Sequence, residues 1–568
     1  MAQDERRLAI CIKGGISLGA YEAGVLTQTL AMITNHNGQC KAKQLPPWYI
    51  DAFAGASAGA MTALGTALTL IDCNDSHLHE MWVEGADLSV LAPDESSVSA
   101  DESYKAGHTL LAALSLDALA KSAKLTQVPA QLTKWHGALR PGGDTIELVF
   151  TLSNLDGQPQ RLDSLNDAPL GYREYADRMK WQVAIDGFGN VMVRADDTRG
   201  VGQLGTTDSG TAWLAALQAA IAAGSFPLAF TQRGLYRYPH PPEPVGIFYS
   251  DGGIFDNDPV GELIKVAHDI DWSPAHPAYQ DKQRRFLIVH TESVDLSVQT
   301  FGLINQTRDM PVLDFLGKLI PAFMSEQMQS GLRGITQVNT LFDQRRQTLN
   351  RLATLAMQPA SLGWQAALDV MLPMLAQMRD LSDKLDQLRG YLIGDLEDVD
   401  PVLHDFVIKM PAAPQLLFRD LALFFDLAYD IAAKVKIDPI LIAPTGRLAG
   451  DPLYAFAGFF WQTLRAFDFG RGQHDAFLAW KAIAERTAEF TIEGMEEPPA
   501  SDTLPEKDQN AVADTSPYEA SAQLFKERVK KVMDETFEEL ENRAKGLAAL
   551  GINMAQLLAD IGLWLSKF

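Results

Sequence analysis

The stretch Gly55-Ala56-Ser57-Ala58-Gly59 stands between a β-type run and a helical run, and this junction decides the fold. Residues 48–54 before it read Trp-Tyr-Ile-Asp-Ala-Phe-Ala, and residues 60–70 after it are rich in Ala, Thr and Leu. A serine at a sharp strand-to-helix turn has its hydroxyl pushed clear of the sheet edge, and flanking glycines let both backbones approach closely. We therefore predict that Ser57 is a nucleophile. A tight turn of small residues between packed elements is the alternative.

A second glycine-rich turn follows the first strand-like run of the chain. Residues 8–12 read as a buried strand, residues 13–19 are Lys-Gly-Gly-Ile-Ser-Leu-Gly, and residues 20–26 begin a helix. Such a turn directs several backbone N–H groups toward one point, which suits either a phosphate or a developing alkoxide. Counted from Gly14, the third position of the dinucleotide fingerprint is Ile16 instead of glycine, and no Walker-type ending is present. The pattern favours an oxyanion hole over nucleotide binding.

The base that would activate the serine is predicted to be a carboxylate. An α/β-hydrolase places an acid and then a histidine after the serine, but of eleven histidines we place only His290 near a sheet edge. The Gly-Gly pair of Ser250-Asp251-Gly252-Gly253 allows a close approach to another loop. Asp251 can accept the Ser57 proton if partial burial raises its pKa. An ordinary turn is the alternative.

Three segments in this order closely resemble those of patatin-like phospholipases. They are Gly14 to Gly19 with the helix after it, Gly55 to Gly59, and Asp251-Gly252-Gly253 with Asn257 and Pro259. Residues 148–157 are similar to the family's core strand and turn, and residues 219–230 to its small-residue helix and proline turn. The resemblance covers about residues 6–295.

The resemblance implies an α/β fold with a three-layer α/β/α catalytic domain and a Ser–Asp dyad without histidine. Carried over by position, Ser57 is the nucleophile and Asp251 the base. The backbone N–H groups of Gly14, Gly15 and Ala58 would face the oxyanion. The motifs would be supported by Gly19, Gly55, Gly59, Gly252 and Gly253. No cofactor is expected, and no metal, because the nearby acidic residues lack the ligand spacing of a calcium loop.

Three residues depart from the family's pattern. Ile16 stands where a third glycine is usual, Leu18 where Arg or Lys is frequent, and Lys13 where a glycine usually precedes the pair. One oxyanion donor could be displaced, and a cation that would help to hold a phosphate is missing. These departures bear on phospholipid preference more than on ester hydrolysis.

Charge and cysteine content bear on substrate and compartment. The 568 residues carry 48 Lys and Arg against 72 Asp and Glu, a net charge of −24. Such a surface is repelled by anionic headgroups and nucleic acid, so a zwitterionic or neutral lipid is the easier substrate, although acidity can also serve solubility. The start of the chain has no apolar signal region, and three cysteines without ligand spacing indicate reduced thiols. We expect a cytoplasmic protein that contacts membranes peripherally at most.

The chain is long enough for two domains. We predict a catalytic domain over 1–300, with insertions near 88–147 and 155–210 and a β-hairpin within the second. Residues 301–568 are predicted to form a helical domain, with an acidic linker near 493–517. This domain's predicted helices cover 315–341, 349–357, 364–391 and 416–435, followed by two near the end. The last, with one apolar face, is expected to pack on the helical domain, on a protein partner or on a second copy, with lipid contact as the alternative.

The sequence thus predicts a serine lipid acyl hydrolase, a phospholipase or esterase that cleaves fatty acyl esters. One alternative is an acyltransferase that uses the same dyad. The other is a non-catalytic lipid-binding or scaffold protein.

Overall fold

The computed structural model describes residues 5–87, 115–162, 170–195, 208–227, 229–237, 245–271, 284–292, 330–357, 401–409, 436–446, 448–450, 457–459 and 461–500. Contacts among them divide the chain into two compact units. The first comprises residues 1–269, 282–329 and 439–568, and the second residues 270–281 and 330–438.

The first unit is built on a mixed sheet, in which the described strands run in the order β5-β4-β3-β2-β1-β8-β9. β1 (Arg6–Ile12), β2 (Trp48–Gly55), β8 (Arg284–Val289) and β9 (Ile440–Ile442) are parallel neighbours, and β2 continues parallel to β3 (Asp144–Leu162). β4 (Leu170–Ile185) and β5 (Val191–Ala195) add antiparallel strands beyond β3. β7 (Val245–Asp251) pairs antiparallel with both β3 and β6 (Arg233–Arg237). The predicted hairpin is confirmed by the β4–β5 pair.

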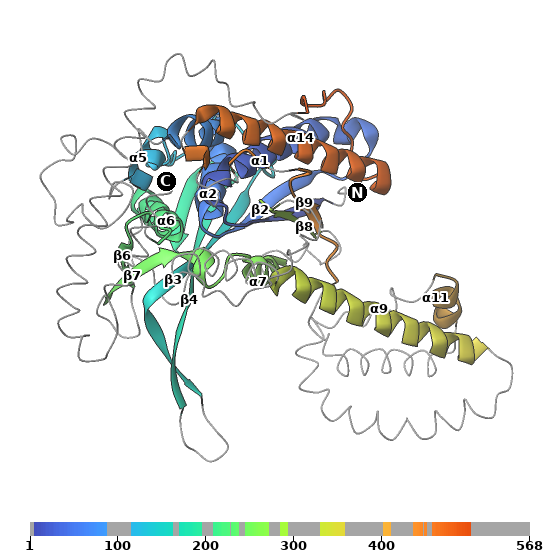
Figure 1. Cartoon of the computed structure of the whole chain (residues 1–568). Coiled ribbons are helices and arrows are strands. Elements are labelled where there is room, and N and C mark those ends of the chain that lie inside the picture. The colour runs from blue at the N-terminus through green and yellow to red at the C-terminus, as the bar shows by residue number, and fades with distance from the viewer. Residues whose placement is uncertain are drawn as a thin grey trace, which may run out of the picture. The chain divides into compact units, whose positions relative to one another are not determined.

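Helices cover this sheet (Figure 1). The longest near the sheet are α1 (Gly19–Lys43), α2 (Ala58–Asp72), α6 (Ser209–Ala223) and α14 (Gln462–Thr487), and α7 (Val260–Asp271) follows β7. Short helical turns complete the described part: η1 (Ile16–Leu18), α3 (His77–His79), η2 (Glu80–Gly85), α5 (Ser115–Ser122), η4 (Gly252–Ile254) and η7 (Ala457–Phe459). β1 is almost wholly buried and every residue of α2 except Asp72 is buried, which explains their apolar sequences. The predicted α/β class, a central sheet flanked by helices, is confirmed.

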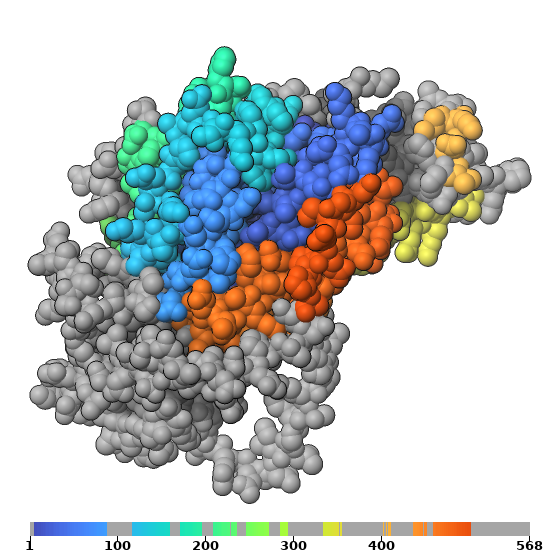
Figure 2. Space-filling view, turned by 90° about the horizontal axis from the view of Figure 1, so that it is seen from above, coloured from blue at the N-terminus to red at the C-terminus, as the bar shows by residue number. Residues whose placement is uncertain are grey.

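The segment from β9 to α14 belongs to the first unit, although it lies far beyond the predicted boundary at residue 300. β9 extends the parallel sheet beside β8, and α14 packs along α1 (Figure 2). Glycines permit this close helix contact: a Cβ on Gly24 would collide with the Phe469 carbonyl, and one on Gly472 with that of Tyr21. The structure therefore divides the chain differently from the sequence, because these late elements cover β8 and α1.

The second unit is helical in its described part. α9 (Ser330–Met357) is one continuous helix where the sequence predicted two, and α11 (Pro401–Ile408) lies against it. Asn339 of α9 exchanges two hydrogen bonds with the backbone of Ile437, at 2.7 and 3.1 Å. The predicted helices over 364–391 and 416–435, most of the acidic linker and the last helix lie outside the described residues.

Candidate active site

Ser57 occupies a strained turn between β2 and α2. Its φ of 51° and ψ of −127° place a non-glycine residue in a region that L-residues rarely adopt. A Cβ on Gly55 would lie 2.5 Å from the Gly59 carbonyl oxygen, and one on Gly59 would collide with the Ile12 carbonyl. Only glycine fits at either position, so the predicted close approach of strand and helix is present.

The Ser57 hydroxyl meets the Asp251 carboxylate. Ser57 Oγ donates to Asp251 Oδ2 at 2.5 Å, across 194 residues of sequence. Strand register explains the encounter: on β3, Phe150 pairs with Gly55 of β2, and Leu152 pairs with Asp251 of β7. β4 occupies the other edge of β3, so the ends of β2 and β7 lie next to each other along the same edge. Ser57 is 2% exposed and Asp251 is 0% exposed.

The loop after β7 fixes the Asp251 carboxylate. The Gly253 N–H donates to Asp251 Oδ1 at 2.7 Å, and a Cβ on Gly252 would collide with the Thr151 carbonyl. Burial raises the pKa of Asp251 to about 7, although the hydrogen bond from Ser57 works in the opposite direction. A carboxylate with this pKa can accept a proton near neutral pH.

The glycine turn after β1 passes beside the serine. A Cβ on Gly14 would lie 2.6 Å from Ser57 Cβ, and one on Gly15 would lie 2.8 Å from Thr291 Cγ2. Ile16, at the position of the missing glycine, adopts a φ of 54°. A β-branched residue in this left-handed region costs roughly 1–2 kcal/mol. The chain therefore makes a left-handed bend at this position without glycine.

Lys13 and His290 contact each other at the ends of β1 and β8. Lys13 Nζ lies 3.3 Å from His290 Nδ1 and 3.4 Å from Glu292 Oε2, and its side chain is buried. Burial lowers the pKa of Lys13, and burial together with Lys13 lowers the pKa of His290 to about 3. Ser57 bonds to Asp251 instead of His290.

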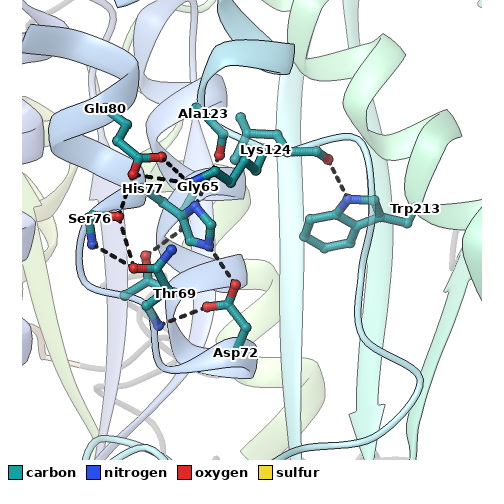
Figure 3. A network of polar contacts seen from close by, with 11 residues as sticks. Gly65, Thr69, Asp72, Ser76, His77, Glu80, Ala123, Lys124 and Trp213 are labelled. Carbon is teal, nitrogen blue, oxygen red and sulfur yellow. Dashed lines mark hydrogen bonds and ion pairs between the residues drawn. The ribbon is translucent and has the colours of Figure 1, made fainter. Parts of the chain in front are cut away.

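A histidine–aspartate pair lies at the opposite end of α2 (Figure 3). His77 Nε2 lies 2.5 Å from Asp72 Oδ2, and His77 Nδ1 lies 3.0 Å from the Ala123 carbonyl oxygen. α2 has 15 residues, which places this pair about 20 Å from Ser57 along the helix axis. The pair therefore cannot serve Ser57.

Two buried residues near the glycine turn received no role from the sequence. Glu22 is fully buried in the first turn of α1; its Oε2 accepts from Thr62 at 3.0 Å, and burial raises its pKa to about 8. Asn257 is fully buried beside Gly14 and Gly253. Glu22 could have been singled out in the sequence, because it is an acidic residue inside a run of small and apolar residues. Asn257 was part of the quoted motif, but its burial depends on tertiary packing and could not be predicted from the sequence.

The described ranges contain neither a metal-binding cluster of acidic, histidine or cysteine side chains nor a helix that could span a membrane. No cluster of three or more His, Cys, Asp or Glu side chains there is arranged to hold a metal ion. None of the helices described there is long and apolar enough to cross a membrane.

Part of the chain is similar to known proteins. Residues 10–264 match the family model described as patatin-like phospholipase. A protein of Sinorhizobium fredii, described as uncharacterized protein y4iI, is 26% identical over 265 residues. The aligned region is 40% of this chain and 36% of that relative, so the chain matches about a third of the relative's length.

Proposed function

Since residues 10–264 form a domain of the patatin-like phospholipase family, we propose that the protein is a serine lipid acyl hydrolase with a Ser57–Asp251 dyad. The 2.5 Å hydrogen bond between the Ser57 hydroxyl and the buried carboxylate carries the proposal. The raised pKa of Asp251, about 7, supports its role as a base near neutral pH.

In the proposed first step, Ser57 Oγ attacks the ester carbonyl carbon while its proton moves to Asp251 Oδ2. The carbonyl π electrons move to the oxygen, and the N–H groups of Gly14, Gly15 and Ala58 donate to this oxyanion. Ala58 begins α2, so its N–H has no acceptor within the helix. When the carbonyl re-forms, the carbon–oxygen bond to the leaving alcohol breaks, and Asp251 returns the proton to that alcohol.

Water completes the cycle. Asp251 takes a proton from a water molecule that attacks the acyl carbon, and the second oxyanion uses the same N–H donors. Collapse of this intermediate breaks the bond to Ser57 Oγ, which regains the proton held by Asp251. A fatty acid leaves and the free enzyme is restored.

We propose a neutral or zwitterionic lipid ester as the substrate. The net charge of −24 disfavours anionic headgroups. Leu18 is buried where the family often has a cation, and the ammonium of Lys13 is bound by His290 and Glu292. Neither residue offers a free charge to a phosphate.

The cysteines and the second unit bear on compartment and partners. The three cysteines are all unpaired, in keeping with the reducing cytoplasm, where we place the enzyme, in peripheral contact with membrane lipid. The region after residue 300 includes the helical second unit, for which we propose a protein partner or self-association.

Replacement of the nucleophile tests this function. Ser57→Ala should lower kcat on a p-nitrophenyl acyl ester at least about 10⁴-fold, because the alanine methyl group cannot form an acyl-enzyme. The control is Ser122→Ala: among the described residues, Ser122 Oγ donates only to the Leu119 carbonyl, at 2.7 Å, so this variant should keep full kcat. Wild-type kcat in Ser57→Ala would refute the assignment. Product analysis with a competing alcohol separates hydrolysis from acyl transfer.

A further inference from the structure

Asn257 is a buried carboxamide without a hydrogen-bond partner. It lies in the loop between η4 and α7, fully buried, and neither Oδ1 nor Nδ2 has a partner among the residues that the structure describes. Buried amides are almost always paired, because the loss of hydration is otherwise uncompensated. This side chain therefore indicates a partner that enters the site.

The carboxamide lies where the glycine turn, Ser57 and the Asp251 loop meet. A Cβ on Gly14 would collide with Asn257 Oδ1 while lying 2.6 Å from Ser57 Cβ. A Cβ on Gly253 would lie 2.5 Å from Asn257 Oδ1 and 2.9 Å from Asp251 Oδ1. A half-turn about the last side-chain bond exchanges Oδ1 and Nδ2 with little change in shape. An amide N–H can thus face the space beside Gly14.

The backbone around Asn257 is held before any ligand binds. The N–H of Asp256 donates to the Gly252 carbonyl at 2.9 Å, and the N–H of Val260 donates to the Asp258 carbonyl at 2.8 Å. The Asp256 carbonyl in turn accepts from Thr151 Oγ1 at 2.8 Å. A donor on such a loop needs little rearrangement when negative charge develops near it.

We propose that Asn257 Nδ2 donates a hydrogen bond to the oxyanion formed at Ser57, beside the backbone donors of Gly14, Gly15 and Ala58. This inference rests on the proposed function and deepens it. Attack by Ser57 places negative charge on the former carbonyl oxygen, and a preorganised amide donor stabilises that charge more than it stabilises the neutral ester. Asn257 would then be a catalytic residue, and its partner would be the substrate.

The test replaces the amide without changing its shape. Asn257→Leu should lower kcat about 100-fold with KM changed less than about threefold, because the lost bond forms only in the transition state. Its Tm should stay the same or rise, since an unpaired buried amide is exchanged for an apolar group of similar shape.

Asn154→Leu is the matched control. Asn154 is equally buried, but its Oδ1 accepts from the N–H groups of Asp156 and Gly157 at 3.0 and 2.9 Å. This variant should lower Tm and leave the kcat of the folded enzyme near the wild-type value.

Two results would overturn the inference. One is wild-type kcat in Asn257→Leu, which together with a lower Tm would indicate a structural amide. The other is a slower breakdown of the acyl-enzyme with unchanged formation, seen as a larger burst of p-nitrophenol, which would indicate that Asn257 holds water. Ser57→Ala, measured in parallel, separates the failures: if it is inactive while Asn257→Leu is fully active, only the role of Asn257 is wrong.

Discussion

A carboxylate hydrogen-bonds to a partner at each end of α2, but the two carboxylates differ in how their charge is stabilised. At the C-terminal end, Asp72 accepts from the Asn74 N–H at 2.9 Å and pairs with His77, whose other ring nitrogen contacts the Ala123 carbonyl. At the N-terminal end, Ser57 is strained and Asp251 is fully desolvated. Satisfied polar groups stabilise a fold, whereas strain and desolvation persist where a reaction uses them.

In the described part of the chain, the polar groups around the two ends also differ: those near Asp72 are paired, whereas one near Ser57 is not. Near Asp72, the Ser76 hydroxyl donates to Glu80 at 2.8 Å and Lys124 forms an ion pair with Glu80 at 3.1 Å (Figure 3). Near Ser57, the Asn257 amide has no partner among the described side chains and backbone groups. The contrast predicts that substitutions at one end change the rate, and that substitutions at the other end change stability.

Among substitutions that compare the two ends of α2, loss of the base should have the largest effect. Asp251→Asn should lower kcat about 10³- to 10⁴-fold, because the amide keeps the shape and cannot take the Ser57 proton. Asp72→Asn makes the same chemical change at the other end of α2 and should keep kcat within about twofold. Steady-state hydrolysis of a p-nitrophenyl ester measures both. An equal loss of kcat in Asp251→Asn and Asp72→Asn would contradict the view that only the N-terminal end of α2 serves the reaction.

An intermediate effect is expected on the pH dependence of kcat/KM. Asp251, with a pKa of about 7, must be ionised to act as a base, so the rate should fall about tenfold per unit as pH drops below 7. Glu22, with a pKa of about 8, ionises at higher pH and would place a buried negative charge near the oxyanion, because its Oε1 lies 3.0 Å from a Cβ added to Gly15. The rate should therefore decline above pH 8.

Two variants check this profile. Glu22→Gln should remove the decline above pH 8 and keep the acid limb. Asp256 also has a raised pKa, about 6, so Asp256→Asn tests whether it contributes to the acid limb, which we expect to persist. A flat profile between pH 5 and 8 in the wild type would contradict the assignment of Asp251 as the base.

The smallest expected effect lies at the C-terminal end of α2. His77→Gln removes the contact with Asp72 and should lower the free energy of unfolding by about 1–2 kcal/mol, with kcat unchanged. Urea denaturation monitored by circular dichroism measures the loss. A stable variant with reduced kcat would show that this end of α2 also serves the reaction.

Local motifs made the fold and the paired side chains predictable. The strand-to-helix turn at Ser57 and the Asp-Gly-Gly segment each carry their geometry within a few residues, and the resemblance of their order to that of patatin-like phospholipases predicted that the two side chains pair. β9 has only three residues, and the sequence of α14 does not say which neighbour it covers. The sequence therefore could not predict that β9 and α14 belong to the first unit, because this depends on tertiary packing.

The remaining features of the site depend on burial, which no local pattern specifies. The sequence identified Lys13 only as a departure from the family's glycine, and it did not predict that the fold would enclose Lys13 with His290 and Glu292. Glu22 reads as an ordinary acidic residue in the first turn of a helix, yet it is fully buried. Their pKa shifts follow from that burial.

The most direct test of the central claim, activation of Ser57 by Asp251, is the rate at which a fluorophosphonate labels Ser57. Mass spectrometry locates the adduct, and the rate is compared between the wild type and Asp251→Asn at pH 8. We predict a single adduct on Ser57 that forms at least about 100-fold more slowly in Asp251→Asn. Labelling at another residue, or equal rates in both proteins, would contradict the account.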